Sequence, residues 1–284
     1  MLKLIGTIEA AKEVIENAPL VPAWEARFRE EAIVRTVHHG THIEGNGLNF
    51  KEKKKVLSGV QIVGRERDIQ EVLNYRNVIT FIETYDKREL TDDVLKHVHE
   101  LTTYRILPEE ACGEYRKSQV VIKNSQTGEI TFRPPASVEV PFLLADFMHW
   151  TNSITPDDIH PVIKAGITHY ELVRIHPFLD GNGRVSRAMA LLVLFQNGYD
   201  VKRFFSLEEH YDREPMNYYE ALQTVMAMDG NQTAWLEYFV EGLAVELTRI
   251  KEKVKGLSTD LKLKKSLGGQ QMTLTERQIK LVEY

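Results

Sequence analysis

The stretch IHPFLDGNGRVSRAM, residues 175–189, constrains the fold of this chain more than any other. Pro177 cannot continue the helix before it, because proline lacks an N–H donor and clashes with the preceding turn. Gly181 and Gly183 then permit a tight turn with little side-chain cover, and a second helical stretch follows until Gly198. The sequence therefore predicts two helices joined by a glycine-rich turn. Free N–H groups at the start of the second helix would point outward, which is a geometry that binds phosphate.

The residues around this turn carry the other groups that phosphate chemistry needs. Asp180 can hold a Mg²⁺ ion that bridges phosphate oxygens. Arg184 and Arg187 share one helix face and can grip phosphates bidentately. His176 is a base whose ordinary pKa lies near physiological pH. An ordinary helix–loop–helix corner with solvated arginines is the alternative, but so many reactive groups at fixed spacing favour a catalytic loop.

The rest of the chain is dominated by helical periodicity. The basic run at residues 51–57 is predicted to be the solvated face of a short helix. Because most of the chain has this helical periodicity, the predicted fold class is mainly α. The longer predicted helices span residues 24–37, 67–85, 141–152, 157–174, 185–196, 215–228 and 233–255, with one more opened by the cap residues Thr91 and Asp92.

One stretch breaks the helical pattern. Residues 119–132, QVVIKNSQTGEITF, are β-branched on both sides of a polar, glycine-containing loop, which predicts a hairpin. Arg133, Pro134 and Pro135 then end its second strand. A lone hairpin is marginal in water, so it must lie on the helical body or wait for a partner strand.

The composition bears on the compartment and the binding partners of this protein. Of its 284 residues 27% are charged, and the net charge of −5 gives no general case for binding nucleic acid or an anionic membrane. No apolar run approaches the ~20 residues of a membrane span. The single cysteine, Cys112, excludes an internal disulfide and fits a reducing compartment. A soluble, cytoplasmic protein is therefore predicted.

The composition shifts after Lys255. Residues 256–271 are polar, basic and glycine-bearing, which predicts a linker. The next segment, MTLTERQIKLVEY, opens a helix with Thr275 as its cap. It is similar to the first helix of a winged helix-turn-helix module that would continue past Tyr284. A nucleotide-sensing, DNA-binding transcriptional regulator is therefore one alternative function.

The string HPFLDGNGRVSR matches the signature of the Fic family, His-x-Phe-x-(Asp/Glu)-Gly-Asn-Gly-(Arg/Lys)-x-x-Arg, at every specified position. The resemblance covers about residues 90–242. It implies a Fic fold, which is a helical core with a β-hairpin flap inserted before the motif. It also implies transfer of AMP from ATP to a Ser, Thr or Tyr hydroxyl of a target protein, with ATP as co-substrate, Mg²⁺ as cofactor and pyrophosphate as the second product.

The resemblance gives each residue of the motif a role. His176 would deprotonate the incoming hydroxyl, and Phe178 would pack in the core and anchor the loop. Asp180 would bind Mg²⁺ on the α- and β-phosphates. The phosphate-binding residues would be Gly181, Asn182 and Gly183 as the anion hole, Arg184 as a phosphate clamp and Arg187 on the γ-phosphate.

The hairpin corresponds to the flap of this family. Its residues Val120, Val121 and Ile122 would clamp a target by main-chain hydrogen bonds to an extended peptide. An edge hairpin without that role is the alternative. Tyr218 and Tyr219 would line the adenine side, although a plain core role fits them equally.

A second acid–Gly–Asn–Gly string lies at residues 44–47, but it lacks the partnering histidine and arginines. Many Fic proteins carry an inhibitory helix with the pattern Ser/Thr-x-x-x-Glu-(Gly/Asn), and Glu44 fits the end of that pattern. Position 40 is glycine, and the nearest hydroxyl is on Thr41, one place late. Glu44 would pair with Arg187 within the chain, take the place of the γ-phosphate and restrain AMP transfer. The same glutamate could instead orient a water for removal of AMP from a target.

Further alternatives stay open. Relatives that transfer phosphate or phosphocholine tend to depart from the motif, and the intact His176 argues against an inactive scaffold. A homodimer is compatible with the resemblance, and DNA would be a partner only through the last module. The predicted regions are an N-terminal helical part with the inhibitory motif (1–89), a Fic core with catalytic loop 176–187 and flap 119–132 (90–255), and the linker with its incomplete module (256–284).

Three histidines, His38, His39 and His42, suggest a metal site because the first and third share a helix face. Apart from Glu44, no further ligand follows at metal spacing, so partly buried or surface histidines are the default interpretation. His97 and His99 lie on different helix faces and receive no role.

Overall fold

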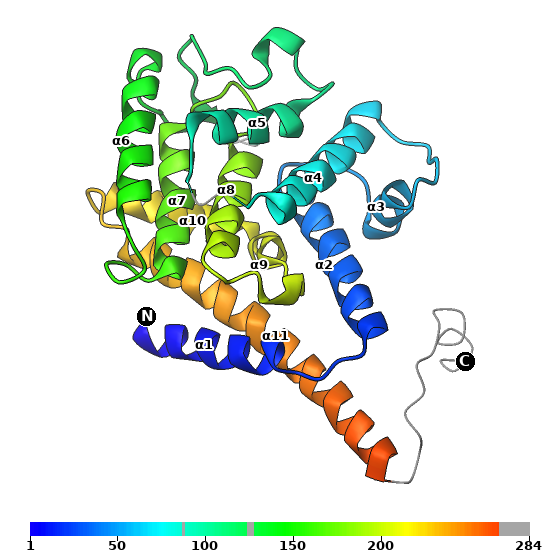
Figure 1. Ribbon diagram of the computed structural model, residues 1–284. Coiled ribbons are helices and arrows are strands. Elements are labelled where there is room, and N and C mark those ends of the chain that lie inside the picture. Colours follow the sequence, from blue (N-terminus) through cyan, green and yellow to red (C-terminus); the bar gives the residue numbers. More distant parts are fainter. Residues whose placement is uncertain (87–88, 124–127, 267–284) are drawn as a thin grey trace.

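The computed structural model of the chain is a bundle of helices with one small β-hairpin (Figure 1). It describes residues 1–86, 89–123 and 128–266, with side chains to residue 257. The predicted mainly α class with a hairpin is confirmed. None of the helices in these ranges is long and apolar enough to cross a membrane. The helices of more than one turn are α1 (Leu2–Glu16), α2 (Pro22–His42), α3 (Phe50–Leu57), α4 (Glu66–Thr84), α5 (Asp92–Thr103), α6 (Val140–Ser153), α7 (Pro161–Ile175), α8 (Asn182–Gln196), α9 (Leu207–Arg213), α10 (Pro215–Ala227) and α11 (Thr233–Ser266).

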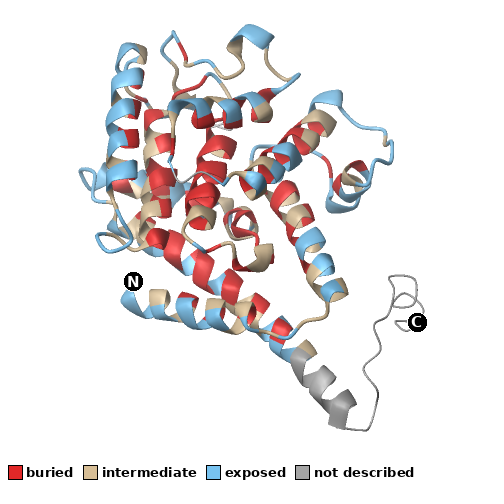
Figure 2. Cartoon of the chain, in the orientation of Figure 1, coloured by how far each residue is buried: buried red, intermediate tan, exposed pale blue. Residues whose placement is uncertain are grey.

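The core is built around α8. This helix is buried from Arg184 to Leu194, and Figure 2 shows it in red along most of its length. α7 lies along α8, and α4 and α5 also pack against it. A helix that is apolar all round needs cover on every side. The glycine-rich turn at the start of α8 is therefore fixed to the centre of the molecule.

The segment with the second acidic string lies beside this core. α2 packs against α4 and α9, and α4 packs in turn against α5 and α8. In Figure 1, α2, α3 and α4 form the right-hand side of the molecule, while α1 runs along α11 below. This packing brings the C-terminal end of α2 close to the N-terminal end of α8.

The hairpin is shorter than predicted. β1 (Ile122–Lys123) pairs antiparallel with β2 (Ile130–Phe132), and Ile122 lies opposite Phe132. Val120 and Val121 precede β1, so their main-chain groups are not part of this ladder. The middle of the predicted loop, residues 124–127, lies outside the described residues.

Three predicted helix boundaries differ most from the structure. The helix predicted over residues 24–37 is α2, which continues to His42. α7 begins at Pro161 and not at residue 157, because proline favours the first helical turn, and the His160 side chain caps that turn. α11 continues to Ser266, whereas a linker was predicted from residue 256. Gly256 is the only glycine in that extension, and a single glycine costs a helix only about 1 kcal/mol. The helix predicted at Thr275 lies outside the described residues.

The basic run also differs from its prediction. It forms α3 as expected, but Lys53 is buried instead of solvated. The Lys53 ammonium donates to the carbonyl oxygen of His38 at 3.1 Å and to Oγ1 of Thr41 at 2.8 Å. Burial lowers the pKa of Lys53 to about 8. Lys53 therefore binds the last turn of α2, where a cation complements the helix dipole.

Candidate active site

The loop between α7 and α8 has a tightly held backbone. His176 ends α7 in the left-handed conformation, with φ of 51°, because the following Pro177 disfavours the helical conformation. Gly181 is also left-handed, with φ of 80°, and begins α8. The Asn182 side chain bonds both the N–H and the carbonyl oxygen of Phe178 at 2.9 Å. These contacts fix the turn before any ligand binds.

His99 on α5 supports this loop, although no role was predicted for it. Its ring stacks on Phe178 with centroids 3.7 Å apart. Its Nδ1 accepts the Gly113 N–H at 2.9 Å, so the hydrogen is on Nε2, which donates to the carbonyl oxygen of Asp180 at 3.1 Å. His99 thereby orients the residue that begins the turn. His97 and His99 lie on different faces of the helix, and this spacing does not predict a contact with the loop.

Arg116 is a second residue that the sequence did not single out. Its Nε donates to the carbonyl oxygen of His176 at 2.8 Å, and its backbone N–H donates to that of Pro177 at 2.9 Å. Its Nη2 donates to the carbonyl oxygen of Pro135, just after the hairpin, at 2.6 Å. Arg116 therefore ties the α7–α8 loop to the base of the flap.

His176 carries the proton acceptor of the site. Its Nδ1 lies 3.3 Å from the carbonyl oxygen of Val173, so Nδ1 carries the hydrogen and Nε2 keeps its lone pair. Burial lowers the pKa of His176 to about 4, which leaves the ring neutral at physiological pH. A neutral imidazole with a lone pair on Nε2 can act as a general base.

A cavity of about 630 Å³ opens in front of the loop. His176 and Gly183 line it, and so do the flap residues Val121 and Ile122. Within the described residues, Val120 does not line the cavity. The cavity therefore joins the predicted base and anion cradle to two of the three predicted flap residues.

The two neighbouring tyrosines of α10 line the same cavity in different ways. Tyr218 is buried, and its hydroxyl lies 2.9 Å from Nε2 of His169. Tyr219 is exposed and donates to the carbonyl oxygen of Ile43 at 3.4 Å. Tyr218 thus belongs to both the core and the cavity wall, while Tyr219 contacts the turn that follows α2.

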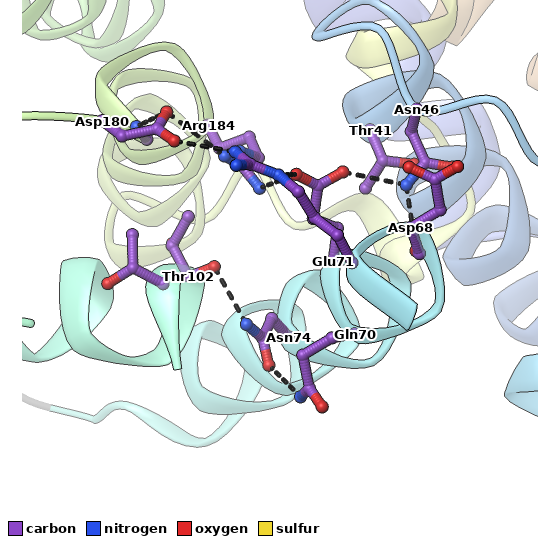
Figure 3. A network of polar contacts seen from close by, with 12 residues as sticks. Thr41, Asn46, Asp68, Gln70, Glu71, Asn74, Thr102, Asp180 and Arg184 are labelled. Carbon is purple, nitrogen blue, oxygen red and sulfur yellow. Dashed lines mark hydrogen bonds and ion pairs between the residues drawn. The ribbon is translucent and has the colours of Figure 1, made fainter. Parts of the chain in front are cut away.

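Asp180 belongs to a polar network that joins α8 to α4 (Figure 3). Its Oδ2 accepts a hydrogen bond from Arg67 at 2.9 Å, and its Oδ1 accepts the Gly181 N–H at 2.5 Å. Although burial opposes ionisation, Arg184 and these donors hold the pKa of Asp180 below its usual value. An ionised, partly exposed carboxylate is the hard oxygen donor that Mg²⁺ takes beside phosphate oxygens, so the side chain fits that ion.

The polar network around Asp180 also includes Asn46, in the segment that follows α2. Arg184 is buried, and its Nη1 lies 3.6 Å from Oε1 of Glu71. Oε2 of Glu71 accepts a hydrogen bond from the Asn46 side chain at 2.9 Å. Figure 3 shows these contacts running from Asp180 through Arg184 and Glu71 to Asn46. Nε and Nη1 of Arg184 donate no hydrogen bond to the described residues, so this buried guanidinium has donors to offer an anion.

Arg187 is buried and is bound by the end of α2. Its Nη1 donates to Oε1 of Glu44 at 2.8 Å, and its Nη2 donates to the carbonyl oxygen of Gly40 at 2.9 Å. The Glu44 carboxylate also lies directly over Gly183, where an added Cβ would overlap Oε1. Glu44 therefore occupies the space in front of the glycine-rich turn and the last arginine of the motif.

A tight turn holds Glu44 in this place. Gly45 takes a φ of 89°, and its N–H donates to the carbonyl oxygen of His42 at 2.8 Å. The Glu44 N–H donates to the carbonyl oxygen of Thr41 at 3.2 Å. The Thr41 hydroxyl donates back into its own helix, to Val37 at 2.8 Å. The hydroxyl that lies one place late in the sequence pattern thus bonds within α2.

Glycine at position 40 has a local reason. A Cβ on Gly40 would overlap Cε1 of the buried Tyr75. The Tyr75 ring is fixed in turn, because its hydroxyl donates to Glu208 at 2.9 Å. The missing side chain lets α2 approach closely enough for the Gly40 carbonyl oxygen to meet Arg187.

Gly40→Ala is therefore expected to destabilise the protein by about 1–3 kcal/mol, the usual cost of overpacking a filled core. Gly6→Ala is the matched control, because Gly6 is also helical but an added Cβ would meet no atom within 4 Å. The control is expected to gain about 0.5–1 kcal/mol. Urea unfolding measures both free energies. Equal values for the two variants would contradict the packing of Gly40 against Tyr75.

Comparison with known proteins shows which family the central part of this chain resembles. A sequence model of the Fic/DOC family matches residues 89–194. The chain is 32% identical over 177 residues to proteins named protein adenylyltransferase Fic from Drosophila grimshawi and Drosophila virilis. The match covers 61% of this chain and 35% of each relative, so the chain spans about a third of their length.

Solved structures share the fold. A Fic family protein from Desulfovibrio desulfuricans G20 has a TM-score of 0.75 and 26% identity, covering 91% of this chain and 74% of that one. A Fic domain containing signaling protein from Bacteroides thetaiotaomicron VPI-5482 has a TM-score of 0.76 and 23% identity, covering 88% and 97%. The names of the curated relatives refer to adenylyl transfer and do not favour the alternatives of AMP removal or DNA binding.

Proposed function

We propose that this chain, which belongs to the Fic/DOC family through its domain at residues 89–194, is a protein adenylyltransferase that moves AMP from ATP to a Ser, Thr or Tyr hydroxyl of a target protein. One observation carries the proposal. The neutral His176, the glycine-rich turn and the flap face a single cavity. Base, anion cradle and peptide-binding strand are the parts that such a transfer needs.

His176 moves the proton in the proposed reaction. Its Nε2 removes the proton from the target hydroxyl while that oxygen bonds to the α-phosphorus of ATP. The bond between the α-phosphorus and the bridging oxygen breaks, and pyrophosphate leaves with its electron pair. The products are the AMP ester of the target and pyrophosphate, and the imidazolium then returns its proton to solvent.

The other residues neutralise charge, which supplies most of the rate in phosphoryl-type transfer. The N–H groups of the turn from Gly181 to Gly183 would bind phosphate oxygens at the start of α8. Arg184 would donate hydrogen bonds to these oxygens from Nε and Nη1, which have no other acceptor among the described residues. Arg187 would hold the γ-phosphate. Asp180 would hold Mg²⁺, which supplies further positive charge beside the phosphates.

Arg67 competes with Mg²⁺ for Asp180 in this proposal, because it donates to Oδ2 at 2.9 Å. Arg67→Ala is expected to lower the Mg²⁺ concentration for half-maximal activity by up to about fivefold, since a partly exposed ion pair contributes about 0.2–1 kcal/mol. Arg65→Ala is the matched control, because Arg65 pairs with Asp68 instead. A magnesium titration of the AMP-transfer rate measures both. Identical curves for the two variants would exclude this competition.

The proposal includes restraint by Glu44. Its carboxylate pairs with Arg187 and covers Gly183, so it takes both the guanidinium and the space that a γ-phosphate would use. Two like charges cannot share that position. ATP would then bind with its α-phosphate misplaced for in-line attack. The restraint is intramolecular, because the pair forms within one chain.

The pH dependence should report the neutral state of His176. The base works only when deprotonated, and its pKa is lowered from 6.5 to about 4. In the Glu44→Gly background, kcat/KM for AMP transfer is therefore expected to stay level as pH falls through 6.5 and to decline only as it nears 4, since kcat/KM reports groups of the free enzyme. A series of buffers at constant ionic strength measures this. An acid limb at 6.5 would mean that burial does not shift His176.

Mass spectrometry tests the proposed reaction. The Glu44→Gly chain is incubated with MgATP, alone and with a cell lysate that supplies acceptor proteins, and tryptic peptides are searched for AMP on Ser, Thr and Tyr. AMP-bearing peptides together with released pyrophosphate are expected. Phosphate-bearing peptides together with ADP would instead identify a kinase and overturn the proposal.

The remaining assignments stay predictions. They are the cytoplasmic location, the homodimer, the DNA partner of the C-terminal module, the clamp formed by Val120, Val121 and Ile122, and the division of the chain near residues 89 and 255. Within the Fic core, residues 176–187 and the flap meet at one cavity, which supports treating them as a unit.

A further inference from the structure

Four side chains converge where the last turn of α2 meets α9. Nδ1 of His39 lies 2.7 Å from Oδ2 of Asp212, and Nδ1 of His42 lies 2.8 Å from Oδ1 of the same carboxylate. The carboxylate side chain is only 4% exposed. Asp212 thus supplies the acidic group that the sequence around the three histidines lacked.

His38 completes the group. Its ring lies with its centroid 4.6 Å from that of His39 and 5.6 Å from that of His42. One ligand atom each from His38, His39 and Asp212 lie within 4.8 Å of one another. A single ion between them can therefore reach all three with small side-chain adjustments, because metal–nitrogen and metal–oxygen bonds are about 2.0–2.2 Å long.

The hydrogen bonds within the cluster leave one atom unexplained. The two oxygens of Asp212 satisfy His39 and His42, but Nδ1 of His38 is buried and has no hydrogen-bond partner in the described part of the chain. Buried polar atoms of folded proteins normally have a partner. A ring nitrogen that has no hydrogen-bond partner can offer its lone pair to a metal ion.

Lys53 does not block the position. Its ammonium is held by the carbonyl oxygen of His38 at 3.1 Å and by Oγ1 of Thr41 at 2.8 Å. Asp212 carries the negative charge that a divalent cation needs nearby. Imidazole nitrogens with one carboxylate are a ligand set typical of zinc and its neighbours among the transition metals.

We propose that His38, His39 and Asp212 form a binding site for a divalent transition-metal ion such as Zn²⁺, with His42 as the fourth ligand. The His42 side chain is 55% exposed, so its ring is free to turn from the carboxylate toward the ion. On binding, each neutral ring carries its single hydrogen on the nitrogen that faces away from the ion, and the other nitrogen donates its lone pair.

The location gives the ion a consequence for the neighbouring site. His42 is two residues before Glu44, and α9 belongs to the helical body through its contacts with α10 and α11. A bound ion would fasten the end of α2 to that body and hold Glu44 against Arg187. This effect on activity rests on the proposed function, whereas the binding of the ion does not.

Metal content tests the site directly. The wild-type chain is stripped with a chelator and titrated with Zn²⁺ against a chromophoric competitor, and bound zinc is measured by mass spectrometry of the element. One zinc per chain is expected in the wild type and in His97→Ala, a control histidine on α5 that contacts Glu100. Affinity is expected to fall by about tenfold or more in Asp212→Asn and His38→Ala, as for the loss of groups that hold a metal.

Two controls separate the possible failures. Asp212→Asn keeps the shape of the side chain, and its circular dichroism spectrum shows whether the fold survives. His176→Ala is expected to keep its zinc, which distinguishes this site from the catalytic loop even if AMP transfer is never observed. Absence of stoichiometric zinc in the wild type, or equal zinc affinity in wild type, Asp212→Asn and His38→Ala, would overturn the proposal.

Discussion

Replacing Glu44 by glycine is expected to raise the rate of AMP transfer by about 10- to 100-fold. In the wild type, ATP must displace the carboxylate from Arg187 before its γ-phosphate can use the guanidinium. A charge-assisted hydrogen bond contributes about 1.5–3 kcal/mol, and about 1.4 kcal/mol corresponds to a factor of ten in rate. The initial rate of labelled AMP incorporation from ATP labelled at the α-phosphate measures the effect.

Matched glutamate variants separate charge from shape. Glu44→Gln keeps the size of the side chain and removes its charge, so an intermediate rate is expected. Glu30→Gln changes an exposed glutamate of α2, the helix that precedes Glu44, and should leave the rate unchanged. Equal incorporation by wild type and Glu44→Gly would refute the inhibitory role of this residue. Removing Glu44 also leaves the buried Arg187 without its carboxylate, so the variant should be less stable until ATP binds.

His176→Ala is expected to lower AMP transfer by about 100- to 10,000-fold in the Glu44→Gly background, which is the usual contribution of a general base. In the proposed reaction the ring removes the hydroxyl proton through Nε2, and among the described residues His176 is the only histidine that lines the cavity. The same incorporation assay measures the loss. Because His176 contacts phosphate only through the target, ATP affinity by calorimetry should change little.

The backbone of His176 requires a second variant. Its φ of 51° lies in the left-handed region, which asparagine tolerates better than alanine. His176→Asn removes the base with less strain on the α7–α8 loop, so it should show the same loss of transfer with a smaller loss of stability. Undiminished transfer in both variants would show that the proton leaves by another route.

Features that the sequence could predict are local ones. Pro177 and the two glycines determine where α7 ends and α8 begins, and the α7–α8 turn is found there. The apolar run of α8 indicated a buried helix because its residues leave no polar face. The base, the carboxylate and the arginines lie within twelve consecutive residues, so their approach to one turn followed from helix geometry alone.

Features that the sequence could not predict depend on contacts between distant segments. Lys53 was predicted to lie on the surface, because it belongs to a basic run. It is buried because α3 packs against α2. Arg116 and His99 support the loop through backbone carbonyl groups, which carry no side-chain pattern. Asp212 meets the histidines of α2 across most of the chain, and no spacing rule links them.

The end of α11 and the glycine at position 40 also depend on tertiary contacts that the sequence does not reveal. α11 passes through Gly256 to Ser266, because a helix already formed and packed on α1 can extend through one unfavourable residue. The glycine at position 40 departs from the family pattern only because Tyr75 fills the space beside it. In both cases a tertiary contact outweighs the local preference of the sequence.

In the proposed reaction a triphosphate lies across the α7–α8 turn once Glu44 is removed, with its α-phosphorus facing His176. The most direct test compares ATP labelled at the α-phosphate with ATP labelled at the γ-phosphate on the Glu44→Gly chain. The α-label should become covalently attached to protein, should be absent with His176→Ala, and the γ-label should appear only in pyrophosphate. Attachment of the γ-label, or of neither label, would rule out AMP transfer at this turn.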